Sequence, residues 1–454
     1  MSTEPGSDAY VPGHGDDSFD VTHYSLGLGY KVIGNRLDGD AVLTCVAAVD
    51  TSAITLDLAG LRVAKVSVDG ATARFEHRGA RLRIRVQLSA HQVFEVRVKY
   101  AGSPGTLKAR HLDEAGWEEL TDGVIVAAQP HGAPTWFPCN DRPSNKATYA
   151  IVMAAPSEYY VAMCGRLTDV RRRGSVVEWT WEMGQPMAPY LATVQIGRYE
   201  ARELANRVVV IAPPDVCGEG YDASFGQQPA MMTFFESVFG PYPFDDYTVV
   251  VTDDPLEIPL ESQSLSTFGR NFASGDWDSV RLVAHELAHQ WFGNAVTLRE
   301  WKDIWLHEGF ACYAEWLWSE ESGRDSAAEQ AAHHHARLAE LDQDLLLADP
   351  GPALMFDDRV YKRGALTLHA LRTVVGDHDF FDILQTWVER FGGGNATTAD
   401  FEALAAEISG ESVGELFEAW LRSTMLPPLP STHSTSLPSL PSLPSPTSLP
   451  SSKR

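Results

Sequence analysis

Short runs of alternating hydrophobic and polar residues dominate the first part of the chain. Examples are "RLRIRVQL" (81–88) and "QVFEVRVKY" (92–100), in which apolar and polar side chains take turns. A period of two places the apolar side chains on one face of a β-strand. Gly, Pro, Asn and Asp separate such runs, from "THYSLGLGYKV" to "PYLATVQIGRYEA", at spacings of roughly 8–12 residues that are typical of all-β domains. The pattern predicts a predominantly antiparallel, sandwich-like β-domain over residues 19–202.

The pattern changes near residue 203. The runs "RVVVIA" and "DDYTVVVTDD" predict two further strands, with the helical "QQPAMMTFFESVFG" between them. After residue 276 the apolar positions recur at helical spacing. The first such helix has Asp278 or Ser279 as its expected N-cap and Gly293 as its C-cap. The helices predicted in this part of the chain are 278–293, 302–323, 361–375, 378–391 and 398–409. The fold class is therefore multidomain α+β, with a mainly helical domain over residues 203–425.

Both ends of the chain lack the pattern of a folded domain. Residues 1–18 are rich in Gly, Asp and Pro and are expected to form a loosely held, flexible arm. Residues 426–454 form a low-complexity tail of Leu, Pro and Ser, a composition that cannot pack a core. We expect this tail to be disordered or polyproline-like. A ligand for a proline-binding module is an open alternative there.

The composition is that of a globular protein with a large excess of acidic residues. Hydrophobic residues make up 44%, charged residues 21%, and the formal net charge is −25. This charge argues against binding a nucleic-acid backbone, which needs clustered Lys and Arg. No basic and apolar leader is present, nor an apolar stretch of the ~18 residues that a membrane span requires. We therefore expect a cytoplasmic protein without a membrane partner. The oligomeric state is left open.

The cysteines indicate the same kind of compartment. They are odd in number, widely spaced and include no CxxC pair, at positions Cys45, Cys139, Cys164, Cys217 and Cys312. This arrangement favours reduced thiols over a disulfide framework.

The stretch "VAHELAHQWFG" (283–293) carries two histidines one helical turn apart. His285 and His289 project from the same face of a helix, so their imidazoles can bind one metal ion. A catalytic zinc site uses three protein ligands in tetrahedral geometry and leaves one position for water. The same sequence pattern would also arise if the two histidines were core residues paired with a glutamate. On this stretch alone, both interpretations remain open.

Two carboxylates on the next predicted helix favour the metal. Glu308 lies nineteen residues after His289 in "WLHEGFACYAEW", where burying an unpaired carboxylate is costly. A dication removes that cost, so Glu308 is the expected third ligand beside His285 and His289. Glu315 lies seven residues later on the same face, where it can hydrogen-bond and orient a ligating imidazole. The sequence therefore predicts one Zn²⁺ per chain.

Glu286 is the candidate for the chemistry. It follows the first histidine but points elsewhere on the helical turn, so it need not bind the metal. A carboxylate next to zinc can take the proton of a water that attacks a carbonyl. The expected reaction is metal-assisted hydrolysis of an amide.

These motifs resemble those of a known family. HELAH, the 18-residue gap and Glu308 in "WLHEGF" resemble the aminopeptidase-N-like family of zinc metallopeptidases, the gluzincin aminopeptidases. "WFPCNDRPSNKATY" (136–149) and "VYKRGALTLHALR" (360–372) resemble the family's FPC-x-D-x-P-x-x-K segment and its tyrosine-bearing helix. The resemblance covers about residues 19–425. It implies an N-terminal β-domain seated on a thermolysin-like catalytic domain, in a short form without the large C-terminal helical domain and with a more open cleft.

The resemblance also implies roles for residues outside the zinc motif. Tyr361 matches the tyrosine that donates a hydrogen bond to the tetrahedral oxyanion, a role that suits a neutral phenol. Glu261 in "IPLESQS" matches the glutamate that binds the substrate's free α-amine, although Ile258 and Ser262 stand where the family has Gly and Asn. Gln129 in "AAQPHGAP" aligns with a second amine-binding residue contributed by the β-domain.

Other polar positions are expected to be structural. Arg363 replaces the family's usual Lys, and His307 replaces a common Asn, for which we expect a packing role. The triplet His333–His335 lies on a polar helical stretch and is expected to be a solvated face without a metal. Cys139, inside the FPC segment, is expected to be a core thiol.

The sequence thus predicts a zinc-dependent aminopeptidase that cleaves the N-terminal peptide bond of peptides with a free N-terminus. Two alternatives remain open. A non-catalytic scaffold member of the same fold is expected to have lost a zinc ligand, the glutamate base or the tyrosine. A bifunctional hydrolase acting on a non-peptide substrate such as an epoxide would use the same zinc.

Overall fold

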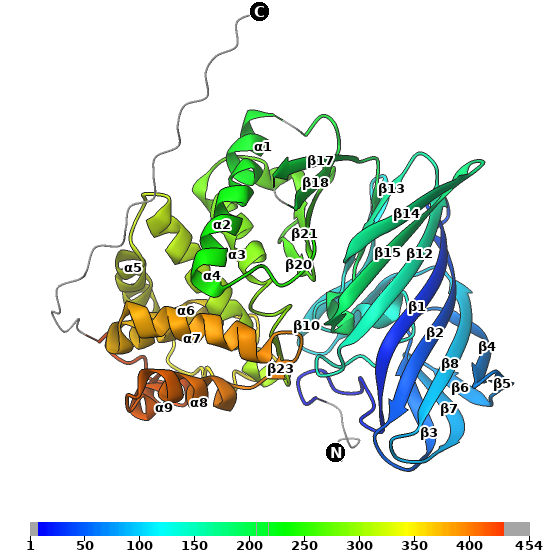
Figure 1. Ribbon diagram of the computed structural model, residues 1–454, viewed down its shortest axis with the longest axis horizontal. Helices are drawn as coiled ribbons and strands as arrows, with labels where there is room; N and C mark the ends of the chain where they lie inside the picture. Colours follow the sequence, from blue (N-terminus) through cyan, green and yellow to red (C-terminus); the bar gives the residue numbers. More distant parts are fainter. Residues whose placement is uncertain (1–7, 206, 217, 431–454) are drawn as a thin grey trace, which may run out of the picture.

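Two domains of different secondary structure lie side by side in the computed structural model, which describes residues 8–205, 207–216 and 218–430 (Figure 1). The β-domain holds the amino-terminal part of the chain, drawn from blue to teal-green. The helical domain holds the rest, drawn from green to orange-red. The predicted tail lies outside the described residues from residue 431 onward.

The β-domain consists of three sheets. The largest has the strand order β14-β15-β12-β1-β2-β8-β4-β5, a second has the order β13-β16-β11-β10-β9, and a third has the order β3-β7-β6. All neighbours in these sheets are antiparallel except the parallel pair β1 and β12. The strands are β1 Phe19–Lys31, β2 Arg36–Ala47, β3 Thr51–Asp57, β4 Arg62–Val68, β5 Ala71–Thr72, β6 Phe75–Arg78, β7 Arg81–Leu88, β8 Val93–Gly102, β9 Thr106–Ala109, β10 Leu112–Leu120, β11 Gly123–Ala127, β12 Ala147–Pro156, β13 Tyr160–Met163, β14 Arg166–Arg173, β15 Val176–Met187 and β16 Val194–Gly197.

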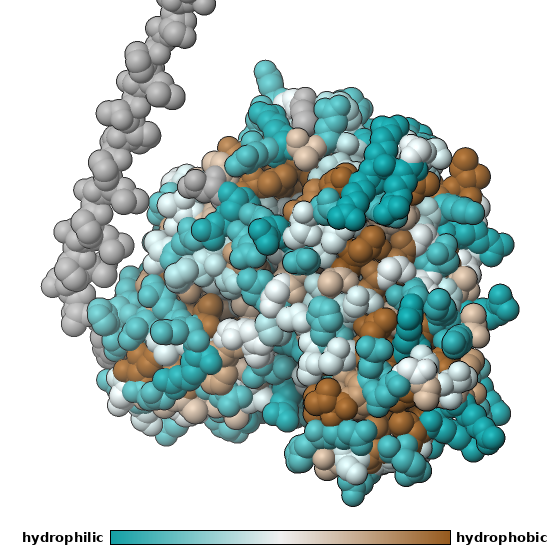
Figure 2. Space-filling model, turned by 45° about the vertical axis from the view of Figure 1, so that its right-hand side comes forward, coloured by the Kyte–Doolittle hydropathy of each residue, from teal (hydrophilic) through white to brown (hydrophobic). Residues whose placement is uncertain are grey.

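The alternation in the sequence explains these strands. β8 alternates between exposed and buried side chains over most of its length, and "RLRIRVQL" forms β7 over the residues predicted from its period of two. The outer face of the largest sheet is open to solvent, with half-exposed valines such as Val152 and Val170 among polar side chains. Figure 2 shows such apolar patches on the side of the molecule that carries this domain. The predicted antiparallel, sandwich-like character of this part is confirmed.

The helical domain is built around one further sheet, with the order β17-β18-β19-β21-β20. Its strands and the short ladder beside it are β17 Glu200–Ala205, β18 Val208–Ala212, β19 Tyr247–Thr252, β20 Leu260–Ser262, β21 Leu265–Gly269, β22 Thr297–Leu298 and β23 Asn395–Ala396. The helices are α1 Glu219–Ser224, α2 Gln228–Phe239, α3 Trp277–Ala288, α4 Trp305–Glu321, α5 Ala327–Ala339, α6 Asp358–Val375, α7 Asp377–Phe391, α8 Thr398–Ser409 and α9 Gly414–Leu421. The predicted α+β fold class is confirmed, with the first strand of this sheet beginning at Glu200.

The ends of α3 correct the prediction from sequence. The N-cap is Asp276, whose carboxylate accepts from the backbone N–H of Ser279 (2.8 Å), so the expected caps Asp278 and Ser279 lie inside the first turn. The helix also ends early, with His289 as its C-cap. Gly293, the expected C-cap, lies in the turn that follows, at φ +127°.

Helices α4 and α6 cross at a pair of glycines. A Cβ added at Gly364 would lie 2.6 Å from the Cα of Gly309, and one added at Gly309 would lie 2.7 Å from the Cα of Gly364. Only residues without a side chain allow two helix backbones to approach this closely. The crossing places Glu308 and Tyr361, each within three residues of a crossing glycine, in the same region of the domain.

Lys146 joins the two domains. Its ammonium, from the β-domain, donates to the carbonyl oxygens of Asn294 (2.9 Å), Ala295 (2.9 Å) and Gly394 (3.3 Å) in the helical domain. Burial lowers the pKa of Lys146 to about 7, whereas the three carbonyls favour the charged form. Because Asn294 and Ala295 follow the histidine segment closely, this contact fixes the β-domain against it.

Residues 8–18 differ from the predicted flexible arm, because they hydrogen-bond to both domains. Asp8 accepts from the backbone N–H of Trp301 in the helical domain (2.7 Å). The backbone N–H of Gly15 donates to Asp57 in the β-domain (2.9 Å). These bonds join backbone groups to carboxylates that are far away in the sequence. The composition of residues 1–18 therefore could not predict them. Residues 1–7 lie outside the described residues.

Two further observations bear on the predictions from composition. The cysteines that the structure describes, Cys45, Cys139, Cys164 and Cys312, are free and buried, and Cys217 is outside the described residues. Within the described ranges, no helix is both long and apolar enough to cross a membrane.

The glycine crossing yields a first prediction. Gly364→Ala should lower the free energy of unfolding by about 1–3 kcal/mol, because the new methyl group meets backbone that cannot move aside. Denaturant unfolding measures this loss. Gly414→Ala, in α9 where an added Cβ meets nothing within 4 Å, is the matched control and should cause no loss. Equal stability of the two variants would contradict the tight crossing.

Candidate active site

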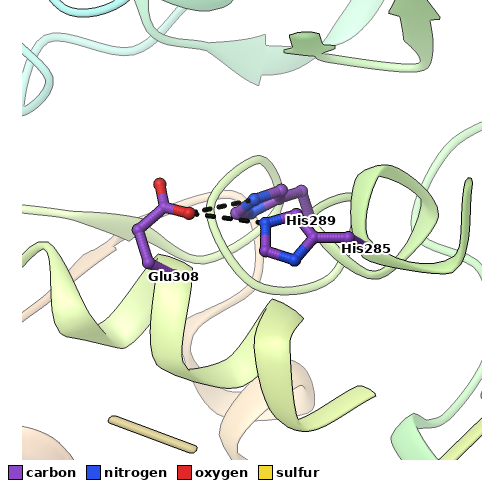
Figure 3. A group of neighbouring side chains, drawn as sticks. All are labelled: His285, His289 and Glu308. Carbon is purple, nitrogen blue, oxygen red and sulfur yellow. Dashed lines mark ion pairs between the residues drawn. The ribbon is translucent and has the colours of Figure 1, made fainter. Parts of the chain in front are cut away.

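Two helices bring the predicted ligands together. His285 on α3, His289 at its C-cap and Glu308 on α4 are all buried. The Nε2 atoms of both histidines lie 3.5 Å from Oε2 of Glu308, and Figure 3 shows the two rings and the carboxylate converging on one point. The histidine side chains reach this point because they are one helical turn apart on the inner face of α3.

This donor set fits zinc. Tetrahedral ligands about 2.0–2.1 Å from an ion are roughly 3.4 Å apart, close to the 3.5 Å separations between Glu308 and each histidine. The same separations exceed the usual 2.7–3.2 Å range of N–H···O hydrogen bonds. Two imidazole nitrogens and one carboxylate oxygen are also typical ligands of a catalytic zinc. His285, His289 and Glu308 would hold the ion.

Glu315 orients His285 from behind. Its Oε1 lies 2.7 Å from Nδ1 of His285, which leaves Nε2 facing Glu308. Its Oε2 lies 3.2 Å from Arg281 and 4.0 Å from Lys362. Burial raises the pKa of Glu315, but Lys362, His285 and Arg281 outweigh it and lower the pKa to about 2. Glu315 is therefore an ionised acceptor.

A backbone carbonyl orients the second histidine. Nδ1 of His289 lies 3.0 Å from the carbonyl oxygen of Phe292. This carbonyl turns back toward the imidazole because α3 has already ended at Ala288. Burial alone would lower the pKa values of both histidines. Nearby carboxylates outweigh it and raise them, to about 8 for His289 and about 10 for His285.

Glu286 points a free carboxylate oxygen into the same region. Its Oε2 is buried and has no hydrogen-bond partner among the residues that the structure describes. Burial is the main cause that raises the pKa of Glu286 to about 8, and the charge of Glu261 raises it further. The carboxylate can therefore exchange a proton near neutral pH.

The amine-binding residues predicted from the family lie beside these groups. Nε2 of Gln129, from the β-domain, donates to Oε1 of Glu261 on β20 (2.5 Å). One side-chain atom each of Glu261, Glu286 and His289 lies within 4.8 Å of the others. Burial raises the pKa of Glu261, and the charge of Glu308 adds to this effect. Ile258 is exposed, so the departure from the family's Gly lies at the surface of the loop.

Tyr361 lies on α6, against the first histidine. Its ring is stacked at 23° to that of His285, with centroids 6.1 Å apart. Burial raises the pKa of Tyr361 well above its ordinary value, and Glu308, Glu261 and Glu286 raise it further. The phenol therefore remains a neutral hydrogen-bond donor.

The other polar positions have structural contacts. Nε2 of His307 accepts from the backbone N–H of Leu298 (2.8 Å), consistent with its expected packing role. Arg363 is buried and its guanidinium donates to backbone carbonyls at the end of α9 and just after it. The side chains of His334 and His335 are not simply solvated. The first stacks on Trp316 with centroids 5.3 Å apart and the second lies 2.7 Å from the carbonyl of Pro427.

Two cations of the site were missed by sequence reasoning. Arg281 lies one turn before His285 on α3, a spacing that places it on the face that meets Glu315. Lys362 follows Tyr361 directly and is mostly buried against Cys312 and Glu315. The four-residue spacing between Arg281 and His285 could have indicated that Arg281 belongs to the site. The contact of Lys362 with Glu315 depends on the crossing of α4 and α6, which the sequence does not indicate.

Comparisons with known proteins match this arrangement. The model of the peptidase M1 N-terminal domain matches residues 21–191, and the model of the peptidase family M1 domain matches residues 223–420. The crystal structure of an M1 zinc metallopeptidase from Deinococcus radiodurans is 32% identical and superposes with a TM-score of 0.85. The match covers 93% of this chain and 99% of that one. The chain belongs to peptidase family M1. The family resemblance of the motifs and zinc as the cofactor are thereby confirmed.

Further similar proteins extend the comparison. Aminopeptidase M1-D of Oryza sativa subsp. japonica is 26% identical over 433 residues, which are 84% of this chain and 47% of that protein. This chain spans about half or less of the length of the first curated relatives it matches. A mutant of the Deinococcus radiodurans metallopeptidase has been solved with a Tyr-Ser-Ala substrate. Native yeast LTA4 hydrolase, 22% identical with a TM-score of 0.79, covers 95% of this chain and 72% of that one and shares the fold.

The contact between Glu315 and His285 yields a second prediction. Glu315→Gln should weaken zinc binding by about 10–100-fold, because His285 loses its charged acceptor. Competition with a chelator of known affinity measures the change. Asp278→Asn removes the exposed carboxylate near Arg281 and should leave the affinity unchanged. Equal affinities of the two variants would show that Glu315 does not support the ligand.

The charge of the metal-free site yields a third prediction. Between about pH 6.5 and 8.5 the metal-free protein should lose stability as the pH rises. The raised pKa values of Glu286, His289 and His285 mean that the folded state binds more protons than the unfolded chain. The stability that these three groups contribute is fully present below their unfolded-state pKa values of 4.5 (Glu) and 6.5 (His). It is lost as the pH rises through their pKa values in the folded protein. Lys146, with its pKa lowered to about 7, has the opposite effect and gains stability as the pH rises. It is one group against three, so the decline should remain.

Melting temperatures in the presence of a chelator measure this dependence. Each proton of difference corresponds to about 1.4 kcal/mol per pH unit. Zinc-loaded protein is the control and should show a weaker decline, because bound metal displaces protons from both histidines. A melting temperature of the metal-free protein that rises over this interval would contradict the assignment.

Proposed function

We propose that this M1 family member is a zinc aminopeptidase that removes the N-terminal residue of peptides. The observation that carries the proposal is the contact between Gln129 and Glu261 next to the three zinc donors. A carboxylate and an amide held together near the reacting centre form a pocket for one ammonium group. Such a pocket limits cleavage to the first peptide bond.

The residues divide the reaction between them. Zinc, when bound by His285, His289 and Glu308, supplies the Lewis acidity that activates water and polarises the scissile carbonyl. Glu286 accepts the proton of the attacking water on its unpartnered Oε2 and then delivers it to the leaving amine. The neutral phenol of Tyr361 donates to the oxyanion as negative charge develops there.

The amine end is bound separately from the reacting carbonyl. Glu261 accepts N–H groups of the α-ammonium and supplies the opposite charge. Gln129, which donates its amide N–H to Glu261, offers its own carbonyl oxygen as a further acceptor. A blocked N-terminus has neither the charge nor the hydrogens that this pair requires.

The two alternatives are less well supported. A scaffold member is expected to have lost a zinc ligand, Glu286 or Tyr361, and this chain retains them all. A non-peptide substrate would not need the polar pair formed by Gln129 and Glu261. The mutant structure of the Deinococcus radiodurans relative bound to a Tyr-Ser-Ala substrate also favours the peptidase.

A fourth prediction tests the proposal directly. The zinc-loaded protein should hydrolyse anilides of free amino acids, in a chelator-sensitive manner, and should not hydrolyse their N-acetyl counterparts. Glu286→Gln should lower kcat by about 10³-fold and retain zinc, because the base is lost and the ligands are not. Glu321→Gln, exposed at the end of α4, is the control and should be as active as the parent.

Three outcomes would contradict the proposal. Strong hydrolysis of the acetylated compounds would exclude an aminopeptidase. No activity of the zinc-loaded protein on any free amino-acid anilide would favour a scaffold. Loss of zinc from Glu286→Gln would show that Glu286 is a ligand rather than a base.

A further inference from the structure

Tyr190 carries a buried hydroxyl group in a segment that contacts the strand of Glu261. Its side chain is contributed by the β-domain, in the short 3₁₀ helix η2 (Pro189–Leu191), and is only 4% exposed. Among the described residues, its hydroxyl oxygen has no hydrogen-bond partner. A buried hydroxyl without a partner is costly, so this one calls for an explanation.

The tyrosine is held between the two elements that carry the site's carboxylates. On one side, the backbone N–H of Gln263, two residues after Glu261, donates to the carbonyl of Leu191 (3.3 Å). On the other side, the ring packs edge-on against Trp301, with centroids 4.9 Å apart. Trp301 starts the 3₁₀ helix η5 (Trp301–Asp303), which leads into α4 and Glu308. Figure 1 shows β20 on the side of the helical domain that faces the β-domain.

The charges around the phenol agree with this placement. Burial raises the pKa of Tyr190 well above its ordinary value, and the negative charges of Glu261 and Glu308 raise it further. The group is therefore a neutral O–H that can donate to a carboxylate while its oxygen accepts from an N–H.

We propose that Tyr190 is a positioning residue of the amine pocket, whose hydroxyl oxygen accepts an N–H of the substrate's α-ammonium and whose O–H donates to Glu261 once the substrate is bound. The inference rests on the proposed aminopeptidase function and deepens it. It adds a third polar group to Gln129 and Glu261, and a second one from the β-domain. The ammonium would then be held at the junction of the two domains by groups from both.

A purely structural role for Tyr190 makes a different prediction. The ring could act only by packing on Trp301, in which case the hydroxyl would be dispensable. Phenylalanine keeps the ring and removes only the oxygen, so Tyr190→Phe separates the two roles. Tyr149→Phe is the matched control, because Tyr149 is a buried tyrosine of the same domain whose hydroxyl also has no partner among the described residues.

The test measures binding of two inhibitors that differ only in the α-amine. Calorimetric titration of the zinc-loaded protein with leucine hydroxamate and with 4-methylpentanoic hydroxamate gives the preference for the amine as a ratio of Kd values. Tyr190→Phe should weaken binding of the amine-bearing compound about tenfold and leave the other unchanged, while zinc content and Tm stay as in the parent. KM for leucine anilide should rise by the same factor with little change in kcat.

The outcomes separate the two proposals. If the parent protein binds both hydroxamates equally, the amine pocket and with it the proposed function fail. If the parent prefers the amine and Tyr190→Phe keeps the full preference, the inference for Tyr190 fails while the function stands. Equal loss for both compounds, or the same loss in Tyr149→Phe, would show a structural effect and would also overturn the inference.

Discussion

The burial of charge is the constraint on which this structure depends. Four carboxylates, those of Glu261, Glu286, Glu308 and Glu315, are withdrawn from water within one region of the helical domain. An isolated carboxylate in such a place would cost more free energy than packing can return, so each needs a partner or a proton. Glu315 has Arg281, Lys362 and His285, and Gln129 donates to Glu261. A dication held by Glu308 and the two histidines would balance the charge of Glu308.

This requirement shapes the surrounding helices. α4 is buried on all sides over most of its length, from Trp305 to Ser319, because it must deliver two carboxylates inward while its other faces pack against neighbouring helices. The β-domain closes the remaining side. Gln129 contacts Glu261 from this side, and Lys146 and the segment around Asp8 hold the two domains together. In the proposed function, the junction between the domains is where the free amine of a substrate is recognised.

The sequence predicted the parts of the site that depend on local spacing. His285, His289, Glu308 and Glu315 follow helical periodicity, and a buried carboxylate on an apolar helix demanded a cation. Gln129, Glu261 and Tyr361 came only from resemblance to a family, because their separation along the chain says nothing about distance in space.

What the sequence could not predict depends on long-range contacts. Several neighbouring polar residues could cap α3. Asp276 is the N-cap because its carboxylate accepts from the backbone N–H of Ser279. The contact of Lys362 with Glu315 forms only because α4 and α6 cross, and Tyr190 packs on Trp301 only because the two domains meet. The anchoring of residues 8–18 likewise depends on partners such as Asp57 and Trp301, which are far away in the sequence.

The glycine pair at the crossing of α4 and α6 has a consequence for motion. Where two helices touch backbone to backbone, at Gly309 and Gly364, neither can slide or roll without a collision of main-chain atoms. Glu308 and Tyr361 therefore travel as one rigid unit. Any relative motion must instead take place at the seam between the domains, where side chains such as Gln129, Lys146 and Asp8 take part in the contacts and small rotations are tolerated.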